Sequence, residues 1–329
     1  MKTIKPKAIF VFALAASLFL GCHSKLKKGY YIDQQIPSDI RDQFHEQNKL
    51  FFEYVKTNYQ VKLRGILSKE LLDGKGLTVR RLDRIKNAIT ENDYQLYKEY
   101  YVVNKWRDAD TIPAGNAAKD FSLKYSGITK EMYFAFFLPK SGDNKKMISL
   151  IYCNFDYGWR LFSIETLPYT INGKTAPELY EQAKKEKEKG YLSGAINSMS
   201  TANACIKPNY MWEYKDDQKM TEFYGELMSE ASKLKFPIMV PSMSSPIAVF
   251  HVWQQRMLDG ALYPDVCYVT KVNIKDTAAV RKEYLALRKQ IDKALPGIDK
   301  DTKCVIYSAY NKMPGREFTD HFDITDKLQ

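Results

Sequence analysis

The sequence predicts an α+β fold in which two small domains are joined by helices. Apolar residues recur at helical spacing near the N-terminus, and the pattern then changes to short apolar runs separated by hairpin turns. Helical spacing returns after residue 171, and a second mixed region begins at residue 237. The chain has 329 residues, of which 45% are apolar and 13% aromatic, which is enough for more than one packed core.

The first predicted domain covers residues 35–170 and begins with helices. Apolar side chains recur every three or four residues after Ser38, whose hydroxyl is suited to cap a helix N-terminus. The same spacing follows in three later segments, the last of which is rich in tyrosine. Helices are therefore expected at residues 38–57, 61–72, 78–89 and 93–103.

Strands are expected in the second half of this domain, where glycine, proline and aspartate separate short apolar runs. The clearest hairpin turn is Asp156-Tyr157-Gly158. Short turns favour pairing in chain order, so the helices are expected to pack on a four-stranded antiparallel meander. The four strands are predicted at residues 121–125, 132–138, 147–153 and 159–164.

This order of elements resembles the nuclear-transport-factor-like fold, also called cystatin-like, in which helices pack into a curved sheet. The resemblance rests on residues 51–54 (FFEY), 63–72 and 156–161 (DYGWRL). It implies a cone whose interior can hold a ligand or host catalysis. The high aromatic content favours a filled interior, and an open pocket is the alternative. The residues expected to line this interior are Tyr125, Phe134, Phe136, Leu150, Tyr152 and Phe162.

Residues 171–236 are predicted to form a helical connector. Small residues such as Ala183 and Ala195, with Gly190 at the turn between two helices, resemble a single tetratricopeptide-type hairpin. One hairpin cannot build a repeat groove, so its expected role is to join the domains. A further apolar stripe from Met220 to Leu234 predicts one more helix.

The second predicted domain covers residues 237–329, after a stretch rich in proline and serine. An amphipathic helix is expected between Asp276 and Leu295, and Pro296-Gly297 ends it. The apolar runs around this helix predict strands at residues 247–253, 266–274 and 304–310.

Residues 1–21 have the pattern of an export signal. Three lysines precede an uninterrupted run of apolar or small residues from Ala8 to Leu20. The run is shorter than the roughly 20 residues that span a bilayer. Because no other stretch could enter a membrane, a multi-pass membrane protein is excluded.

Gly21-Cys22 follows this run and resembles the lipobox of bacterial lipoproteins. In that family the cysteine is modified with diacylglycerol, the preceding peptide is removed and the new N-terminus is acylated. The resemblance implies a lipid anchor on Cys22 and a tether over residues 22–34. Phe19 and Leu20 differ from the aliphatic and small residues usual there, so a cleaved signal without lipid is the alternative. The tether is basic, which favours the periplasmic side of the outer membrane in the cell envelope.

The formal net charge is +11, and removal of residues 1–21, which carry three lysines and no acid, lowers it to +8. The remaining excess is scattered and not gathered in a stripe, and an envelope location makes nucleic acid an unsuitable partner. The expected partners are the membrane, through lipid on Cys22, and another envelope protein.

Four cysteines follow Cys22, and their wide spacing fits neither a zinc site nor a redox dithiol. Cys267 and Cys304 lie in two predicted strands, so a disulfide between them and two buried thiols are the alternatives. His251 lies in an apolar run and is expected as a packed core or edge residue. His321 and Asp323 share a strand face without a third metal ligand, so no metal site is predicted.

The sequence contains no phosphate-binding loop, no dinucleotide fingerprint, no hydrolase elbow and no zinc-protease motif. No catalytic residues and no cofactor are therefore predicted. The expected function is that of an envelope lipoprotein that binds or scaffolds another envelope component. The alternative is a small-molecule-binding protein or enzyme that uses the pocket of the cone.

Overall fold

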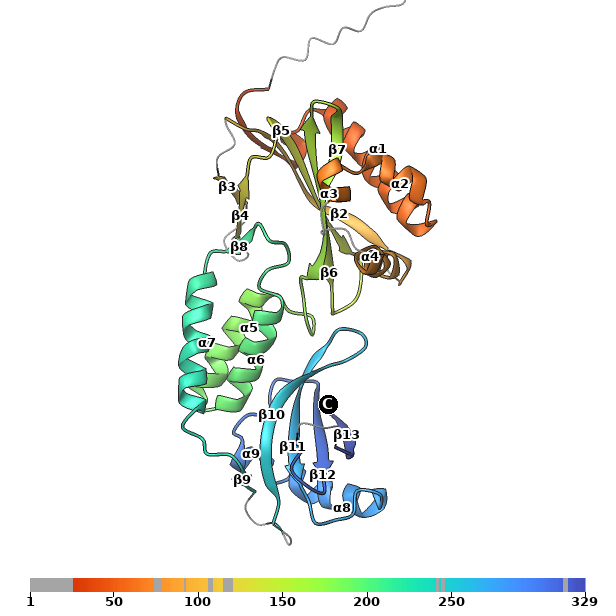
Figure 1. Ribbon diagram of the computed structural model, residues 1–329. Coiled ribbons are helices and arrows are strands. Elements are labelled where there is room, and N and C mark those ends of the chain that lie inside the picture. The colour runs from red at the N-terminus through yellow and green to blue at the C-terminus, as the bar shows by residue number, and fades with distance from the viewer. Residues whose placement is uncertain are drawn as a thin grey trace, which may run out of the picture.

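The computed structural model describes residues 26–73, 79–91, 93–105, 109–114, 121–240, 243, 246–315 and 319–328. The predicted signal segment and Cys22 lie outside the described residues. The described chain is mixed α+β, as predicted, and forms an elongated body (Figure 1). The N-terminal domain lies at one end, the C-terminal domain at the other, and the helical connector lies beside their junction. No helix among the described residues has the length and apolar character needed to cross a membrane.

The N-terminal domain is built on a five-stranded antiparallel sheet in the order β1-β2-β5-β6-β7. Its last three strands pair in chain order, as the predicted meander requires. Four helices cover one face of the sheet (Figure 1). The strands are β1 (Gly29–Ile32), β2 (Tyr94–Val103), β5 (Glu131–Pro139), β6 (Lys146–Phe155) and β7 (Gly158–Pro168). The helices are α1 (Ser38–Lys56), α2 (Gln60–Ile66), α3 (Lys69–Asp73) and α4 (Val79–Glu91), and a 3-10 turn, η1 (Asp33–Gln35), precedes them.

Five local expectations for this domain are wrong. The tether predicted over residues 22–34 extends too far, because Gly29–Ile32 forms β1 and pairs with β2. The helix predicted over residues 61–72 is divided into α2 and α3, because the chain is extended at Leu67. The segment expected as a helix over residues 93–103 forms strand β2 from Tyr94 onward, because tyrosine and valine favour strands and β5 is available as a partner. Strand β4 (Phe121–Ser126) does not join the meander. It pairs with β3 (Ala109–Ala114) and β8 (Trp212–Tyr214) in a separate three-stranded sheet. Ser38 is the first residue of α1, and Pro37 occupies the N-cap position.

The five-stranded sheet separates two cores, because successive side chains of a strand point to opposite faces. On β5, Tyr133 and Phe137 pack under the helices, whereas Phe134 and Phe136 pack against the connector. The second of these cores includes apolar residues of all three connector helices. The predicted boundary at residue 170 therefore separates two segments that share one core.

The connector contains α5 (Ala176–Glu188), α6 (Leu192–Ala204) and α7 (Asp217–Ala231). The first two form the predicted hairpin, and Gly190 between them has a φ of 77°, which favours glycine. Thr175 begins α5 with a capping box, in which its backbone N–H and its hydroxyl donate to the Glu178 carboxylate.

The C-terminal domain is a five-stranded sheet in the order β13-β12-β11-β10-β9, with its own apolar core. Strands β11 and β12 are parallel, and both helices of this domain lie in the crossover between them. The strands are β9 (Ile238–Met239), β10 (Ala248–Arg256), β11 (Leu262–Val269), β12 (Cys304–Tyr310) and β13 (His321–Lys327). The helices are α8 (Thr277–Arg288) and α9 (Ile291–Ala294).

Candidate functional site

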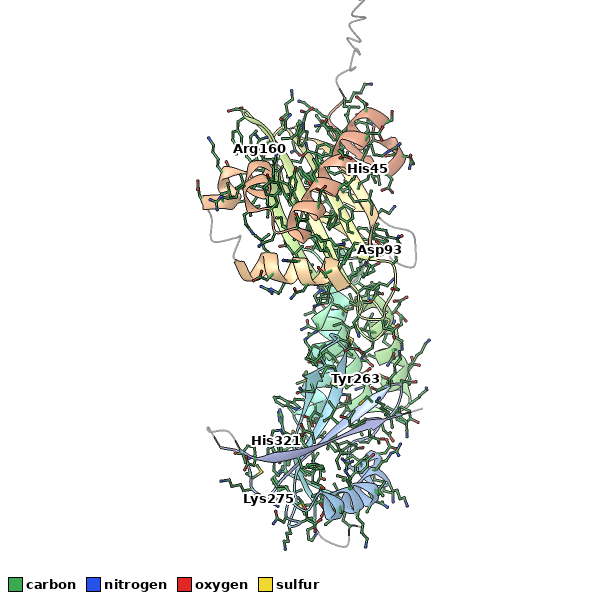
Figure 2. All side chains as sticks on the ribbon, turned by 90° about the vertical axis from the view of Figure 1, so that its right-hand side faces the viewer. His45, Asp93, Arg160, Tyr263, Lys275 and His321 are labelled. Atoms are coloured by element: carbon green, nitrogen blue, oxygen red, sulfur yellow. The ribbon has the colours of Figure 1, made fainter. Side chains whose placement is uncertain are left out.

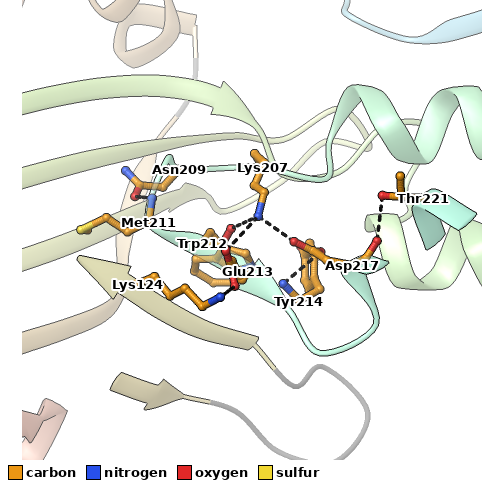
Figure 3. Close-up of polar contacts among 9 residues, drawn as sticks. All are labelled: Lys124, Lys207, Asn209, Met211, Trp212, Glu213, Tyr214, Asp217 and Thr221. Atoms are coloured by element: carbon orange, nitrogen blue, oxygen red, sulfur yellow. Dashed lines mark hydrogen bonds and ion pairs between the residues drawn. The ribbon is translucent and has the colours of Figure 1, made fainter. Parts of the chain in front are cut away.

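The connector is joined to the N-terminal domain by strand β8, which pairs with β4 (Figure 3). Trp212 of β8 stacks on Phe121 of β4, with ring centroids 3.6 Å apart. Lys207, which precedes β8, holds this strand next to the start of α7. Its ammonium donates to the Trp212 carbonyl at 3.0 Å and to Asp217 at 2.6 Å. The connector and the N-terminal domain are therefore packed together at strands β4 and β8.

The connector is joined to the C-terminal domain by a close backbone contact between α6 and the loop after α9. The amide of Ser193 donates to the carbonyl of Pro296 at 3.0 Å. A Cβ on Gly194 would lie 2.8 Å from the carbonyl oxygen of Gly297, so the approach requires glycine. Gln254 of β10 adds hydrogen bonds to backbone and side-chain oxygens of α6.

A third junction joins the C-terminal domain both to the start of the connector and to the N-terminal domain. The side-chain amide of Asn172 donates to the Leu262 carbonyl at 2.7 Å, and its oxygen accepts from the Leu262 amide at 3.3 Å. Lys303, just before β12, donates to Asp143 in the β5–β6 turn at 2.6 Å. This hydrogen bond and charge hold the pKa of Asp143 below its usual value. The β10–β11 hairpin is thereby fastened to the end of the N-terminal sheet.

Beside this junction lies a cleft of about 700 Å³, which we call the interdomain cleft. Its walls come from α4, the start of β2, the β5–β6 turn, the β10–β11 hairpin and the residue before β12. Figure 2 places Tyr263, a lining residue, near the edge of the C-terminal domain and Asp93, next to the lining residue Tyr94, at the facing edge of the N-terminal domain. The charged lining residues are Arg84, Lys146, Lys303, Asp143 and Asp259.

The interdomain cleft is polar, since amides, hydroxyls and charges of both signs line it. Lys146 forms no ion pair within the described part of the chain, so its ammonium is available to a ligand. Burial raises the pKa of the Tyr263 hydroxyl, which stays neutral and can donate a hydrogen bond. The arrangement can hold a polar ligand of mixed charge.

Sequence reasoning did not find this cleft. Its walls come from segments that lie far apart in the chain, and each segment by itself looks like an ordinary turn or hairpin. The glycine and asparagine turn residues at 142, 144 and 172 were the only local signal, and such residues are common in all turns.

The six residues predicted to line the cone are buried in two separate cores. Tyr125, Phe134 and Phe136 lie in the core shared with the connector, and Phe162 packs partly buried against it. Leu150 and Tyr152 lie under the helices on the other face. None of the six lines the interdomain cleft, and their burial makes them core residues and not one ligand-binding wall.

Cys267 and Cys304 are free and buried thiols, so of the two alternatives the disulfide is not formed. Cys267 lies opposite Ser308 in the parallel pair of β11 and β12. Ser308 is four residues from Cys304, which places the two cysteines about 13 Å apart along the strand. A disulfide needs Cα atoms within about 7 Å.

Two buried polar clusters were also missed by sequence reasoning. Glu99 of β2 is 3% exposed, accepts a hydrogen bond from the Tyr133 hydroxyl at 2.5 Å and lies 3.0 Å from Nε2 of His45. These residues tie α1 to two strands of the sheet. They border none of the described cavities, so they serve as an internal contact.

The second cluster is on the C-terminal sheet. The Asp265 carboxylate accepts from Trp253 at 2.6 Å and lies 2.8 Å from the Ser308 hydroxyl, which is also 2.8 Å from Asp323. One hydroxyl proton cannot serve both carboxylates, so the geometry favours a proton on one of them. Burial raises the pKa of the Asp265 carboxyl.

The two histidines of this domain lie on strands β10 and β13. His321 lies 3.5 Å from Asp323, and no group of three metal-binding side chains occurs among the described residues. His251 lies exposed on β10 beside Trp253 and outside the core.

The chain matches no protein-family model, no curated protein and no solved structure. The likenesses to the nuclear-transport-factor-like fold and to a tetratricopeptide hairpin thus remain resemblances of pattern.

Proposed function

We propose that this protein is held in the cell envelope by lipid on Cys22 and binds another envelope component in the interdomain cleft. The signal pattern of residues 1–21 and the Gly21-Cys22 pair support the anchor. The cleft of about 700 Å³ between the two domains is the observation that carries the binding role.

The position of the interdomain cleft suits recognition, because ligand sites occur preferentially at domain interfaces. The Asn172–Leu262 and Lys303–Asp143 contacts hold the two sides together before any ligand arrives. A preformed site loses less conformational entropy on binding. The polar lining favours a partner that presents hydroxyl, amide or charged groups.

A second candidate function is the binding of a small polar molecule in the same cleft. Its volume falls within the about 300–1,000 Å³ typical of small-ligand sites. This candidate replaces the cone pocket as the place for a small ligand, because the cone residues are packed in cores.

The anchor is tested by labelling cells with radioactive palmitate. We expect label in the wild-type protein and none in Cys22→Ala, whereas Cys304→Ala, which removes a different cysteine, keeps it. Equal labelling of the wild type and Cys22→Ala contradicts the anchor.

The binding role is tested by placing a photo-crosslinking amino acid at Leu258, which lines the cleft and is fully exposed. The matched control is Leu285, which is exposed on α8 away from the cleft. We expect a discrete adduct in intact cells from position 258 and none from 285, and we expect Lys146→Ala to reduce it. Identical adducts from both positions contradict a cleft partner.

The two candidate functions differ in a further measurement. A small polar ligand raises the melting temperature of the purified protein when a metabolite panel is added, since it binds only the folded state. Stabilisation by a panel member, lost in Lys146→Ala, together with no adduct from position 258, selects the small-molecule role.

A further inference from the structure

A second cavity, of about 1050 Å³, lies at the opposite end of the N-terminal sheet from the interdomain cleft. We call it the tether groove. It is bordered by the ends of β2 and β6, the starts of β1, β5 and β7, and helix α3. This end of the sheet points away from the C-terminal domain (Figure 1).

The tether groove contains three exposed lysines. Lys28, Lys105 and Lys130 all line it, and within the described residues none of them forms an ion pair. Its two carboxylates are Glu70 and Asp156. The Glu70 carboxylate accepts a hydrogen bond from the Tyr157 hydroxyl at 3.0 Å. Three ammonium groups against two carboxylates leave the lining with a net charge of +1, which favours an anionic ligand.

The rim of the groove is aromatic as well as basic. Phe155 stacks on Tyr157, with ring centroids 5.1 Å apart. The Lys69 ammonium lies 4.9 Å from the Tyr157 ring centroid, and the Arg160 guanidinium lies 5.6 Å from it. Partly exposed aromatic rings next to cations are the composition that proteins use at membrane–water interfaces.

The distance along the chain relates this groove to the membrane. Lys28 is six residues after Cys22, and an extended chain of that length reaches about 20 Å. If lipid on Cys22 enters the bilayer, the groove lies within that distance of the headgroups. The chemistry of the groove and its distance from the anchor thus point to the same ligand.

We propose that the tether groove binds the phosphate headgroup of an anionic phospholipid in the membrane that holds Cys22. This inference rests on the proposed anchor for its choice of ligand. Lysine ammoniums attract the headgroup phosphate, and the aromatic rim lies at the level of the interface. The body then stands with its N-terminal end on the membrane and presents the interdomain cleft away from it.

The test uses the mature chain from residue 22 with alanine at that position, so that no lipid anchor contributes. This chain keeps every residue of the described body. Binding is measured by sedimentation with vesicles of phosphatidylcholine, with and without phosphatidylglycerol. The test variant is Lys105→Ala with Lys130→Ala, and the matched control is Lys271→Ala with Lys275→Ala. Figure 2 shows Lys275 at the far end of the molecule from Arg160.

We expect binding to vesicles that contain phosphatidylglycerol and a loss of about thirtyfold in affinity for the test variant. Each lysine near an anionic surface contributes a factor of about five. The control variant is expected to bind like the parent chain. Equal binding of the two variants, or no dependence on phosphatidylglycerol, overturns the proposal.

Chemical acetylation of lysines gives an independent readout that needs no variant. Phosphatidylglycerol vesicles are expected to protect Lys105 and Lys130 from acetylation and to leave Lys275 reactive. Equal protection by soluble glycerol phosphate at the same phosphate concentration overturns the proposal in favour of a free phosphate ligand. Because neither experiment uses the lipid on Cys22, failure of the anchor and failure of the groove are seen separately.

Discussion

The amide side chain of Asn172 pairs with the backbone of Leu262 in the way that a neighbouring strand would. It donates to the Leu262 carbonyl at 2.7 Å and accepts from the Leu262 amide at 3.3 Å. The φ of Asn172 is 54°, a left-handed conformation that asparagine tolerates better than most residues. One side chain therefore fastens the β10–β11 hairpin to the start of the connector, beside the interdomain cleft.

Replacement of Asn172 by glycine tests this contact without adding backbone strain. Asn172→Gly removes both hydrogen bonds, each of which contributes about 1 kcal/mol. We expect faster hydrogen exchange at the Leu262 amide and a slightly lower melting temperature. Asn58→Gly is the control, since Asn58 also has a positive φ and lies at the end of α1. Unchanged hydrogen exchange at the Leu262 amide in Asn172→Gly contradicts the role of these two hydrogen bonds.

Two helical glycines are expected to respond to alanine with opposite signs. Alanine favours a helix over glycine by about 1 kcal/mol, so Gly225→Ala on α7, where nothing lies within 4 Å of the new Cβ, should stabilise the protein. In Gly194→Ala the new Cβ meets the Gly297 carbonyl, and such overpacking costs about 1–3 kcal/mol. Thermal unfolding measures both, and stabilisation by both substitutions would disprove the close contact.

The buried carboxyl of Asp265 predicts a specific dependence of stability on pH. Burial raises its folded pKa above the unfolded value of about 3.9, so the folded state binds more protons. The contribution of Asp265 to the free energy of unfolding is therefore complete below the unfolded pKa. It decreases as the pH rises through the folded pKa. We expect Asp265→Asn to gain stability relative to the wild type from pH 4 to pH 7, measured by urea unfolding.

Asp143 is the control for this experiment, because Lys303 lowers its pKa. Its contribution is present above the unfolded pKa and decreases as pH falls, so Asp143→Asn should lose stability relative to the wild type as pH rises. A difference between Asp265→Asn and the wild type that is constant across this pH range contradicts the assignment for Asp265.

The four described cysteines are expected to be unreactive in the native protein. All four are buried, and burial raises the pKa of Cys153 and of Cys205 to about 12, which suppresses the reactive thiolate. A thiol reagent at pH 8 should label them slowly before unfolding and completely in urea without a reducing agent. Fewer than four labelled thiols in urea would indicate a disulfide.

The helices of the N-terminal half could be predicted because their signal is local. The apolar spacing after Ser38 predicts a helix over residues 38–57, and α1 covers Ser38–Lys56. Strand β2 was not predicted, because its partner β5 lies some 30 residues away and no local pattern indicates that the two segments pair. Phe121 was placed in the meander for the same reason, since its stacking partner Trp212 comes from the connector.

The sequence by itself determined the α+β class and placed most of the helical segments, whereas the export signal stays a prediction. These properties depend on composition and on spacing within one segment. The tertiary structure alone decided which strands share a sheet, that the cone residues divide between two cores, and that a cleft lies between the domains. Contacts such as Asn172 with Leu262 and Lys303 with Asp143 join residues that are far apart in the chain, and only the folded chain brings them together.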